Sequence, residues 1–150
     1  MSWLRFVVPA LALVVGALIA IALLKRRAVE DLRQRLEGRT IVYGDKGANF
    51  FGVESKGQGQ LRGNGVLVLT PSLLIFEMLL PRREMVIDVA RIQRVSKVRS
   101  HLHKSIMRPL LRVDYDDGDE GADAVAWYVR DVERWMSEIA AVCDCEVGEG

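Results

Sequence analysis

Residues 6–24 read FVVPALALVVGALIAIALL, and this stretch decides how the rest of the chain is organised. It contains no charged or polar side chain. At a rise of about 1.5 Å per residue, a helix of this length spans about 28 Å, close to the roughly 30 Å hydrocarbon core of a bilayer. Core helices of soluble proteins are usually amphipathic, whereas this one is apolar on every side. The stretch therefore predicts a membrane-spanning helix.

The flanks of this helix indicate its orientation. A cleaved signal peptide is the alternative, but only Arg5 is charged ahead of the run and no A-x-A-like site closes it. Basic residues are concentrated after the span, which by the positive-inside rule places the C-terminal domain in the cytoplasm, at the plasma (inner) membrane. The expected membrane-interface anchors are Trp3, Arg5, Lys25, Arg26 and Arg27.

The remaining chain is long enough for one compact domain and too short for two. We expect an anchor over residues 1–27, a helical stalk over 28–38, a β-domain over 39–143 and a flexible tail over 144–150. The stalk has Val29, Leu32 and Leu36 at helical spacing and ends at Gly38; a helix lying on the membrane surface is the alternative. The net charge of +1 argues against nucleic acid as a partner.

Short apolar runs separated by turn residues follow the stalk and predict strands. The expected strands are residues 40–43, 48–54, 66–70, 73–80, 84–89, 110–115 and 124–129. Residues 130–142 have an apolar face at helical spacing and Asp131 as N-cap, so a final amphipathic helix is expected to cover the sheet.

Motifs for catalysis and cofactor binding are not found. Arg62 occupies the position at which a dinucleotide fingerprint beginning at Gly57 needs its third glycine, and no nucleophile–histidine order is present. The chain has the residue types of a His2Cys2 zinc site in His101, His103, Cys143 and Cys145, but these residues lack the spacing that structural zinc sites usually have. We therefore expect no enzyme, no cofactor and no metal, and two free thiols, because the cysteines are only one residue apart.

The order of about seven antiparallel strands and one C-terminal helix resembles a PH-like domain of the GRAM type. The resemblance covers roughly residues 40–143 and rests on GVLVLT (65–70), LIF (74–76), RRE (82–84), IDVARI (87–92), LRVDYDDG (111–118), AWYV (126–129) and Trp135. It implies a mainly β fold, a bent barrel or sandwich capped by the helix, which binds phospholipids or protein partners and is not an enzyme. Lys56 and Arg62 match the family's phosphoinositide motif, but Asn64 replaces its final arginine.

Charge segregation gives the clearest functional hint. Residues 89–113 contain no acid but seven lysines and arginines and both histidines. Helical spacing of Ile92, Val95, Val98, Leu102 and Ile106 suits a basic amphipathic helix, whereas the PH-like register makes residues 91–99 a strand, which we favour. The basic stretch over residues 91–112 either binds anionic lipid or is a solvated surface that pairs with the acids of residues 116–123.

These observations predict a single-pass, membrane-anchored PH-like module that binds a protein partner at the cytoplasmic membrane face. The alternative is an anionic-phospholipid-binding or lipid-sensing domain. Its candidate contacts are Lys56, Arg62, Arg82, Arg83, Lys97, Arg99, His101, His103, Lys104 and Arg108.

Overall fold

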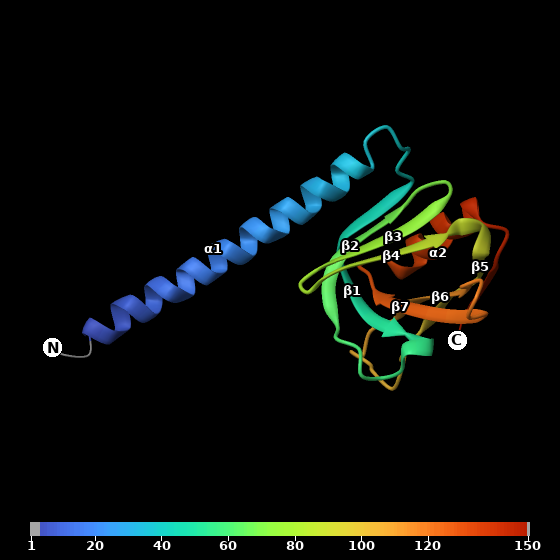
Figure 1. The fold of residues 1–150 in the computed structure, drawn as a ribbon. Coiled ribbons are helices and arrows are strands. Elements are labelled where there is room, and N and C mark those ends of the chain that lie inside the picture. Colours follow the sequence, from blue (N-terminus) through green and yellow to red (C-terminus); the bar gives the residue numbers. More distant parts are fainter. Residues whose placement is uncertain (1–3, 150) are drawn as a thin grey trace. The chain divides into compact units, whose positions relative to one another are not determined.

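The computed structural model describes residues 4–149, with side chains from residue 6 onward (Figure 1). The chain divides into two units, with the boundary between Glu37 and Gly38. Each unit is described separately below. Of the expected interface anchors, Trp3 and the side chain of Arg5 lie outside the described part.

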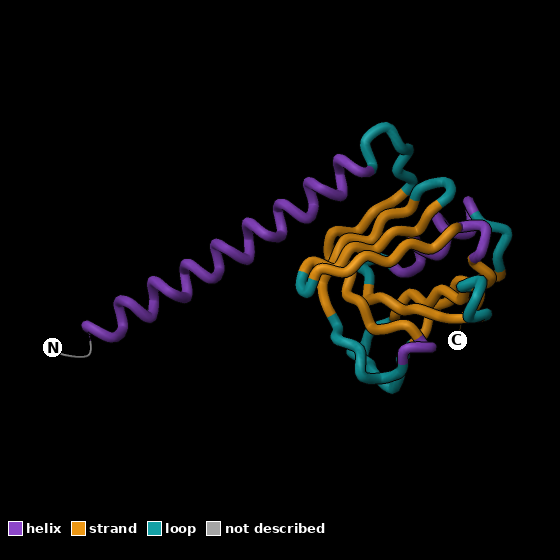
Figure 2. The backbone as a smooth tube through the Cα atoms, in the orientation of Figure 1, coloured by secondary structure: helices purple, strands orange, loops and turns teal. Residues whose placement is uncertain are grey.

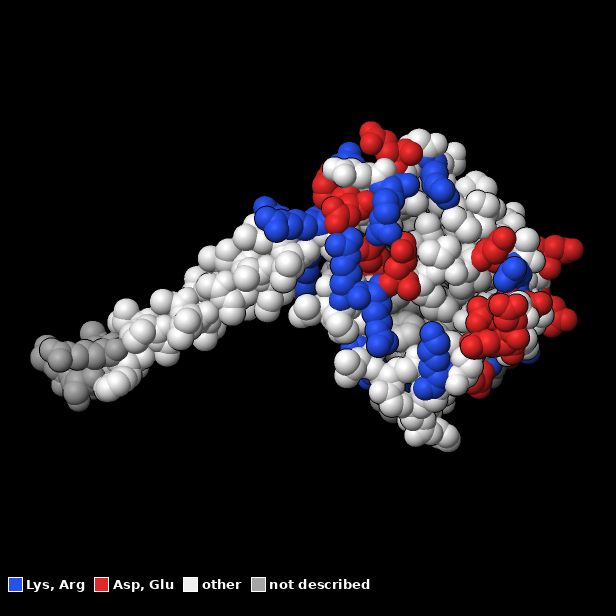
Figure 3. All heavy atoms as spheres, in the orientation of Figure 1, with Lys and Arg blue, Asp and Glu red and all other residues white. Residues whose placement is uncertain are grey.

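The N-terminal unit is the helix α1, Leu4–Arg35. Its apolar side chains are exposed along the predicted span, and the helix is long and apolar enough to cross a membrane. A signal sequence near an N-terminus has the same character. Figure 3 shows this surface without charge for most of its length, with Lys and Arg near the C-terminal end of the helix. The expected stalk continues the same helix, and Gly38 follows with a φ of 79°.

The second unit is mainly β. In the described part of the chain one sheet has eight strands, in the order β4-β3-β2-β1-β7-β6-β5-β8, and all neighbours are antiparallel except β5 and β8 (Figure 2). The elements are β1 (Tyr43–Val53), η1 (Glu54–Lys56), β2 (Gly63–Leu69), β3 (Leu73–Leu79), β4 (Arg82–Asp88), η2 (Val89–Arg91), β5 (Ile92–Val98), β6 (Leu110–Asp116), β7 (Ala122–Tyr128), α2 (Val132–Val142) and β8 (Glu146–Glu149).

Residues 40–54 differ from the expected pair of short strands. Residues 43–53 form one strand, β1, whose pairing with β2 is interrupted by a bulge between Asp45 and Ala48, and residues 40–42 precede this strand. The carboxylate of Asp45 accepts hydrogen bonds from the backbone N–H groups of Gly47 (2.7 Å) and Arg130 (3.0 Å). The polar residues that resemble a turn in the sequence are therefore held inside the strand by a contact with the chain just before α2.

The main core lies between the inner face of the sheet and α2. Phe76, Trp127 and Trp135 are among its largest fully buried side chains. Asp131 caps α2 as expected, because its carboxylate accepts a hydrogen bond from the Arg134 N–H at 3.0 Å. All members of this core come from residues 42–145, so the β-domain contains the hydrophobic core that independent folding requires.

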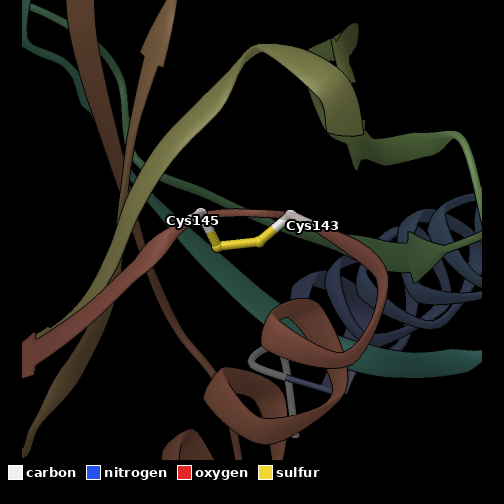
Figure 4. The surroundings of a disulfide bond; sticks show 2 residues. All are labelled: Cys143 and Cys145. Atoms are coloured by element: carbon white, nitrogen blue, oxygen red, sulfur yellow. A yellow bond between two sulfur atoms is a disulfide. The ribbon is translucent and has the colours of Figure 1, made fainter.

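The end of the chain corrects two expectations. Residues 146–149 of the expected flexible tail form β8, which pairs in parallel with β5. Cys143 and Cys145 are joined by a disulfide and are not free thiols (Figure 4). The chain turns from α2 into β8 here, which brings the two Cα atoms to 5.3 Å, inside the usual range for a bridge.

The basic segment adopts the strand alternative. β5 covers Ile92–Val98, with Ile92 and Val95 buried in the main core. Residues 99–109 then form a long irregular connection to β6. The helical spacing of apolar residues here therefore does not reflect a helix.

Candidate functional site

A pocket opens beside β4, the strand that ends the described sheet on one side. Its volume is about 190 Å³. Phe50 and Val53 of β1 and Phe76 and Met78 of β3 give it an apolar lining, and residues 83–86 of β4 form one wall. We call this pocket and its β4 wall the edge groove.

The rim of the edge groove carries both signs of charge. Lys56 and Arg83 lie among the lining residues together with Glu84, Asp117 and Asp123. Carboxylates repel phosphate, so this rim does not have the one-sided positive charge that a multiply phosphorylated head group requires. Enclosed small-molecule sites typically have volumes of about 300–1,000 Å³, so the pocket has room for one side chain rather than a cofactor.

Asp123 holds one side of this groove together. Its carboxylate accepts hydrogen bonds from the Ser55 hydroxyl (2.6 Å), the Ser55 N–H (3.0 Å) and the Ala124 N–H (2.8 Å). Burial by itself raises the pKa of Asp123, but these hydrogen bonds outweigh it and bring the pKa below its usual value. Burial and the negative charge of Asp123 raise the pKa of Tyr115, which therefore remains a neutral phenol in the groove.

A second surface is built on the opposite face of the sheet. Residues 99–109 cover a small apolar cluster of Phe51, Leu110 and Ala126, to which Ile106 contributes from above. Arg62 lies over the Phe51 ring at 3.9 Å to the centroid. We call residues 99–109, together with the adjoining residues 60–62, the loop surface. Figures 1 and 2 place these two segments side by side at one end of the domain.

One hydrogen bond connects the two segments of the loop surface, and a second one joins residues 99–109 to β1. The Lys104 ammonium donates to the Gln60 carbonyl at 3.1 Å. The His101 Nε2 lies 3.0 Å from the Gly52 carbonyl oxygen, which can only accept, so the imidazole carries its proton on Nε2. Burial and the nearby Arg112 lower the pKa of His101. His101 is 3% exposed, and its selection as a lipid-contacting residue is therefore wrong.

The structure separates the cationic candidates into different environments. Lys97 binds Glu133 (2.6 Å) and Glu149 (2.8 Å), and these hydrogen bonds raise the pKa of Lys97 to about 12. Outside the candidate list, Arg112 pairs with Glu54 and Asp114, both at 2.8 Å. The basic stretch of residues 91–112 is therefore not one cationic surface, because folding brings acids from distant segments to two of its cations.

The other candidates divide between the two surfaces. Arg82 pairs with the buried Glu77 at 3.1 Å, and Lys56 and Arg83 line the edge groove. The Arg108 guanidinium donates to the Tyr128 hydroxyl at 2.9 Å. The loop surface brings together Arg62, Arg99, His103, Lys104 and Arg108.

No group of three or more potential metal ligands gathers anywhere within residues 4–149. The arithmetic set of two histidines and two cysteines thus does not form a site, since His101 is buried on Gly52 and the cysteines bond to each other. The acidic segment between β6 and β7 is a hairpin tip, closed by the hydrogen bond from the Asp117 N–H to the Gly121 carbonyl (2.9 Å).

Sequence reasoning missed the apolar tips of the loop surface. Met107 is 96% exposed and Leu61 is 63% exposed, each among basic residues. An apolar side chain next to a single arginine is a weak signal, because most apolar residues turn inward on folding. The edge groove was also missed, since its residues come from four separate stretches of the chain.

Comparison with known proteins yields structural likeness only. No protein-family model and no curated protein matches the chain. Among solved structures, it is similar to the C-terminal domain of an unknown protein from Leishmania infantum, with 16% identity and a TM-score of 0.52 over 77% of this chain and 91% of that one. It is also similar to a chain of the 8S snRNP assembly intermediate, with 12% identity and a TM-score of 0.52 over 68% of this chain and 80% of that one. Structural similarity at these sequence identities indicates a common fold and does not assign a function to this chain.

Proposed function

We propose that this protein is a single-pass, membrane-anchored binding module whose PH-like β-domain captures an extended segment of a protein partner. The observation that carries the proposal is the edge groove: an apolar pocket for one side chain, placed directly against an edge strand. The element order, in which seven antiparallel strands precede α2, supports the PH-like description.

An edge strand presents backbone donors and acceptors to an incoming strand. β4 pairs with β3 along its whole length, from Arg82 to Asp88, and ends the described sheet on that side. Adding a peptide strand here satisfies backbone groups of both partners and gives affinity, while a pocket for an alternate side chain gives selectivity. Val86 of β4 is 50% exposed and offers an apolar contact beside the pocket.

The expected occupant is an extended peptide with one apolar anchor residue. The apolar lining of the pocket accepts the anchor, and the mixed rim charges pair with polar residues on either side of it. A lipid head group is a poorer occupant, since three carboxylates line the pocket.

The proposed location is the plasma (inner) membrane, with the β-domain on the cytoplasmic side. Lys25, Arg26 and Arg27 directly after the apolar run support this orientation. The disulfide argues the other way, because disulfides are rare in the cytosol. A reporter enzyme that is active in only one compartment, fused to the C-terminus, decides the orientation. Reporter activity on the outer side of the membrane would contradict a cytoplasmic β-domain.

The binding function is tested with full-length protein in nanodiscs and a phage-displayed library of random peptides. Selection should enrich sequences that share one apolar position. Met85→Trp, which fills the groove from its β4 wall, should weaken these peptides at least tenfold, and Arg83→Glu should change the preferred flanking charges. Lys46→Glu, an exposed change on β1 away from the groove, serves as control and should bind normally.

Thermal unfolding of the Met85→Trp protein shows whether the variant keeps its fold. The absence of any enriched sequence, or enriched peptides that bind a folded Met85→Trp protein as well as the unmodified one, would overturn the proposal.

A further inference from the structure

The connection between β5 and β6 is an ordered platform rather than a free loop. The His101–Gly52 hydrogen bond holds it on β1, and the Lys104–Gln60 hydrogen bond holds it against residues 60–62. Within it, the Ser105 hydroxyl donates to the Arg99 carbonyl at 2.8 Å and accepts from the Met107 N–H at 3.2 Å. The segment is therefore held in one shape above the small apolar cluster.

This shape exposes an apolar side chain. Met107 has a φ of 59°, a conformation that side chains other than glycine rarely adopt. Its side chain is 96% exposed, so the unusual backbone gains no burial in return. Leu61, in the neighbouring segment fastened through Gln60, is 63% exposed. Unusual backbone geometry that presents an unburied apolar group indicates a functional contact.

The charges around these tips are mostly positive. Arg99 and Arg108 line one hollow with Met107, while Arg62 follows Leu61 and Lys104 bonds to Gln60; within residues 4–149 none of these four cations forms a salt bridge. The acids that border the same hollow, Glu133 and Glu149, are both bonded to Lys97. Arg99 also lies close enough to contribute to the lowered pKa of Glu149. Lys97 thus makes the direct contacts with both acids, and Arg99 interacts with Glu149 only at longer range.

We propose that the loop surface docks on the anionic leaflet of the membrane that holds α1, with Met107 and Leu61 entering the lipid interface. Three features point to a membrane surface as the ligand: exposed apolar side chains, basic residues next to them, and a short connection between α1 and the β-domain. Eighteen residues, 25–42, separate the end of the predicted span at Leu24 from the start of β1 at Tyr43, and the first eleven of them continue α1, so the β-domain is tethered within a short reach of the bilayer. Methionine is unbranched and adapts its shape to an irregular apolar environment, and arginine and lysine are attracted to anionic head groups.

This inference uses a different surface and a different ligand from the proposed peptide function. Gln60 belongs to the loop surface and also lines the edge groove, but β4 lies outside the loop surface, so docking leaves β4 available. Docking would hold the groove in a constant orientation toward proteins in the same membrane.

The test is hydrogen exchange on the full-length protein in two kinds of nanodisc, phosphatidylcholine alone and phosphatidylcholine mixed with phosphatidylserine. We expect residues 60–62 and 99–109 to exchange more slowly in the anionic nanodisc. Arg99→Glu with Arg108→Glu should abolish this difference, and Met107→Ser should reduce it while leaving the charge unchanged. The matched control is Lys46→Glu with Arg91→Glu, which makes the same change in net charge elsewhere on the domain and should keep the protection.

Vesicle co-sedimentation of the β-domain, residues 38–150, gives the affinity. At about 1 kcal/mol per basic residue, removing the charges of Arg99 and Arg108 lowers the affinity about 30-fold, and reversing them to glutamate should lower it by at least that factor. Equal exchange in both nanodiscs, or equal loss in the control, would overturn the proposal. An unchanged Met107→Ser protein would also overturn it and would indicate a general polyanion surface instead. Peptide binding by the groove should survive every loop variant, so the two proposals fail independently.

Discussion

The edge groove and the loop surface contain the same kinds of residue and differ in where folding places the acids. In the groove, Glu84, Asp117 and Asp123 share the rim with Lys56 and Arg83. At the loop surface, Glu133 and Glu149 are bound by Lys97, and the arginines nearby keep their charge. The comparison teaches that a list of cations in a sequence does not define an anion-binding surface; the position of every acid in the folded domain matters equally.

The largest difference between the two regions should appear in stability. Phe76 lines the groove and is also buried in the main core, where it stacks on Phe50 at 5.7 Å between ring centroids. Phe76→Ala should lower the free energy of unfolding of the β-domain by about 3–5 kcal/mol, because it leaves a cavity. Met107→Ala should change it by less than about 0.5 kcal/mol, because Met107 is exposed. Denaturant unfolding of both variants measures this, and equal effects would show that the tip is packed.

The next effect concerns the acid side of the groove. Asp123→Asn should lower the free energy of unfolding of the β-domain by about 1–3 kcal/mol, because the amide replaces a carboxylate that accepts hydrogen bonds from Ser55 and Ala124. The pKa of Asp123 is lower in the folded state than its ordinary value of 3.8. Its contribution is therefore complete above that value and is lost as the pH falls through the folded pKa. The free energy of unfolding should therefore depend less on pH below pH 4 in the variant than in the unmodified protein. The same dependence in both proteins would contradict the role of the carboxylate.

The smallest effect concerns the histidine beneath the loop surface. Burial lowers the pKa of His101 from 6.5, so the folded protein prefers the neutral ring. Below pH 6.5 the unfolded chain binds a proton that the folded chain resists, so stability falls as the pH decreases from that value. His101→Gln, whose amide can still donate to the Gly52 carbonyl, should remove this slope while keeping the fold. A variant with the same slope between pH 7 and pH 5 would assign it to other groups.

Local patterns predicted the elements whose residues decide their own conformation. The uncharged run of residues 6–24 requires a helix that satisfies its own backbone in an apolar environment. The apolar runs of β2, β3, β6 and β7 and the Asp131-capped face of α2 were found within a few residues of their observed ends. The strand β5 was favoured over a helix only by resemblance to a family, since its apolar spacing fits both.

The failures occurred where distant residues decide. The Gly44–Gly47 stretch resembles a turn but continues β1, because Asp45 binds a backbone N–H 85 residues away. The tail residues have no strand pattern, and β8 exists because the edge of β5 is available to them. His101 and Lys97 resemble surface cations, but one is buried on Gly52 and the other is held by two acids.

The sequence by itself determined the hydrophobic helix, its basic flank and the succession of strands, because hydropathy and periodicity are properties of neighbouring residues. Only the tertiary structure decided which charges remain available, which apolar tips stay exposed and where β4 meets a pocket. These depend on pairings across the sheet and between loops, which bring together side chains from separate parts of the chain, and the electrostatics of a surface is set by that assembly.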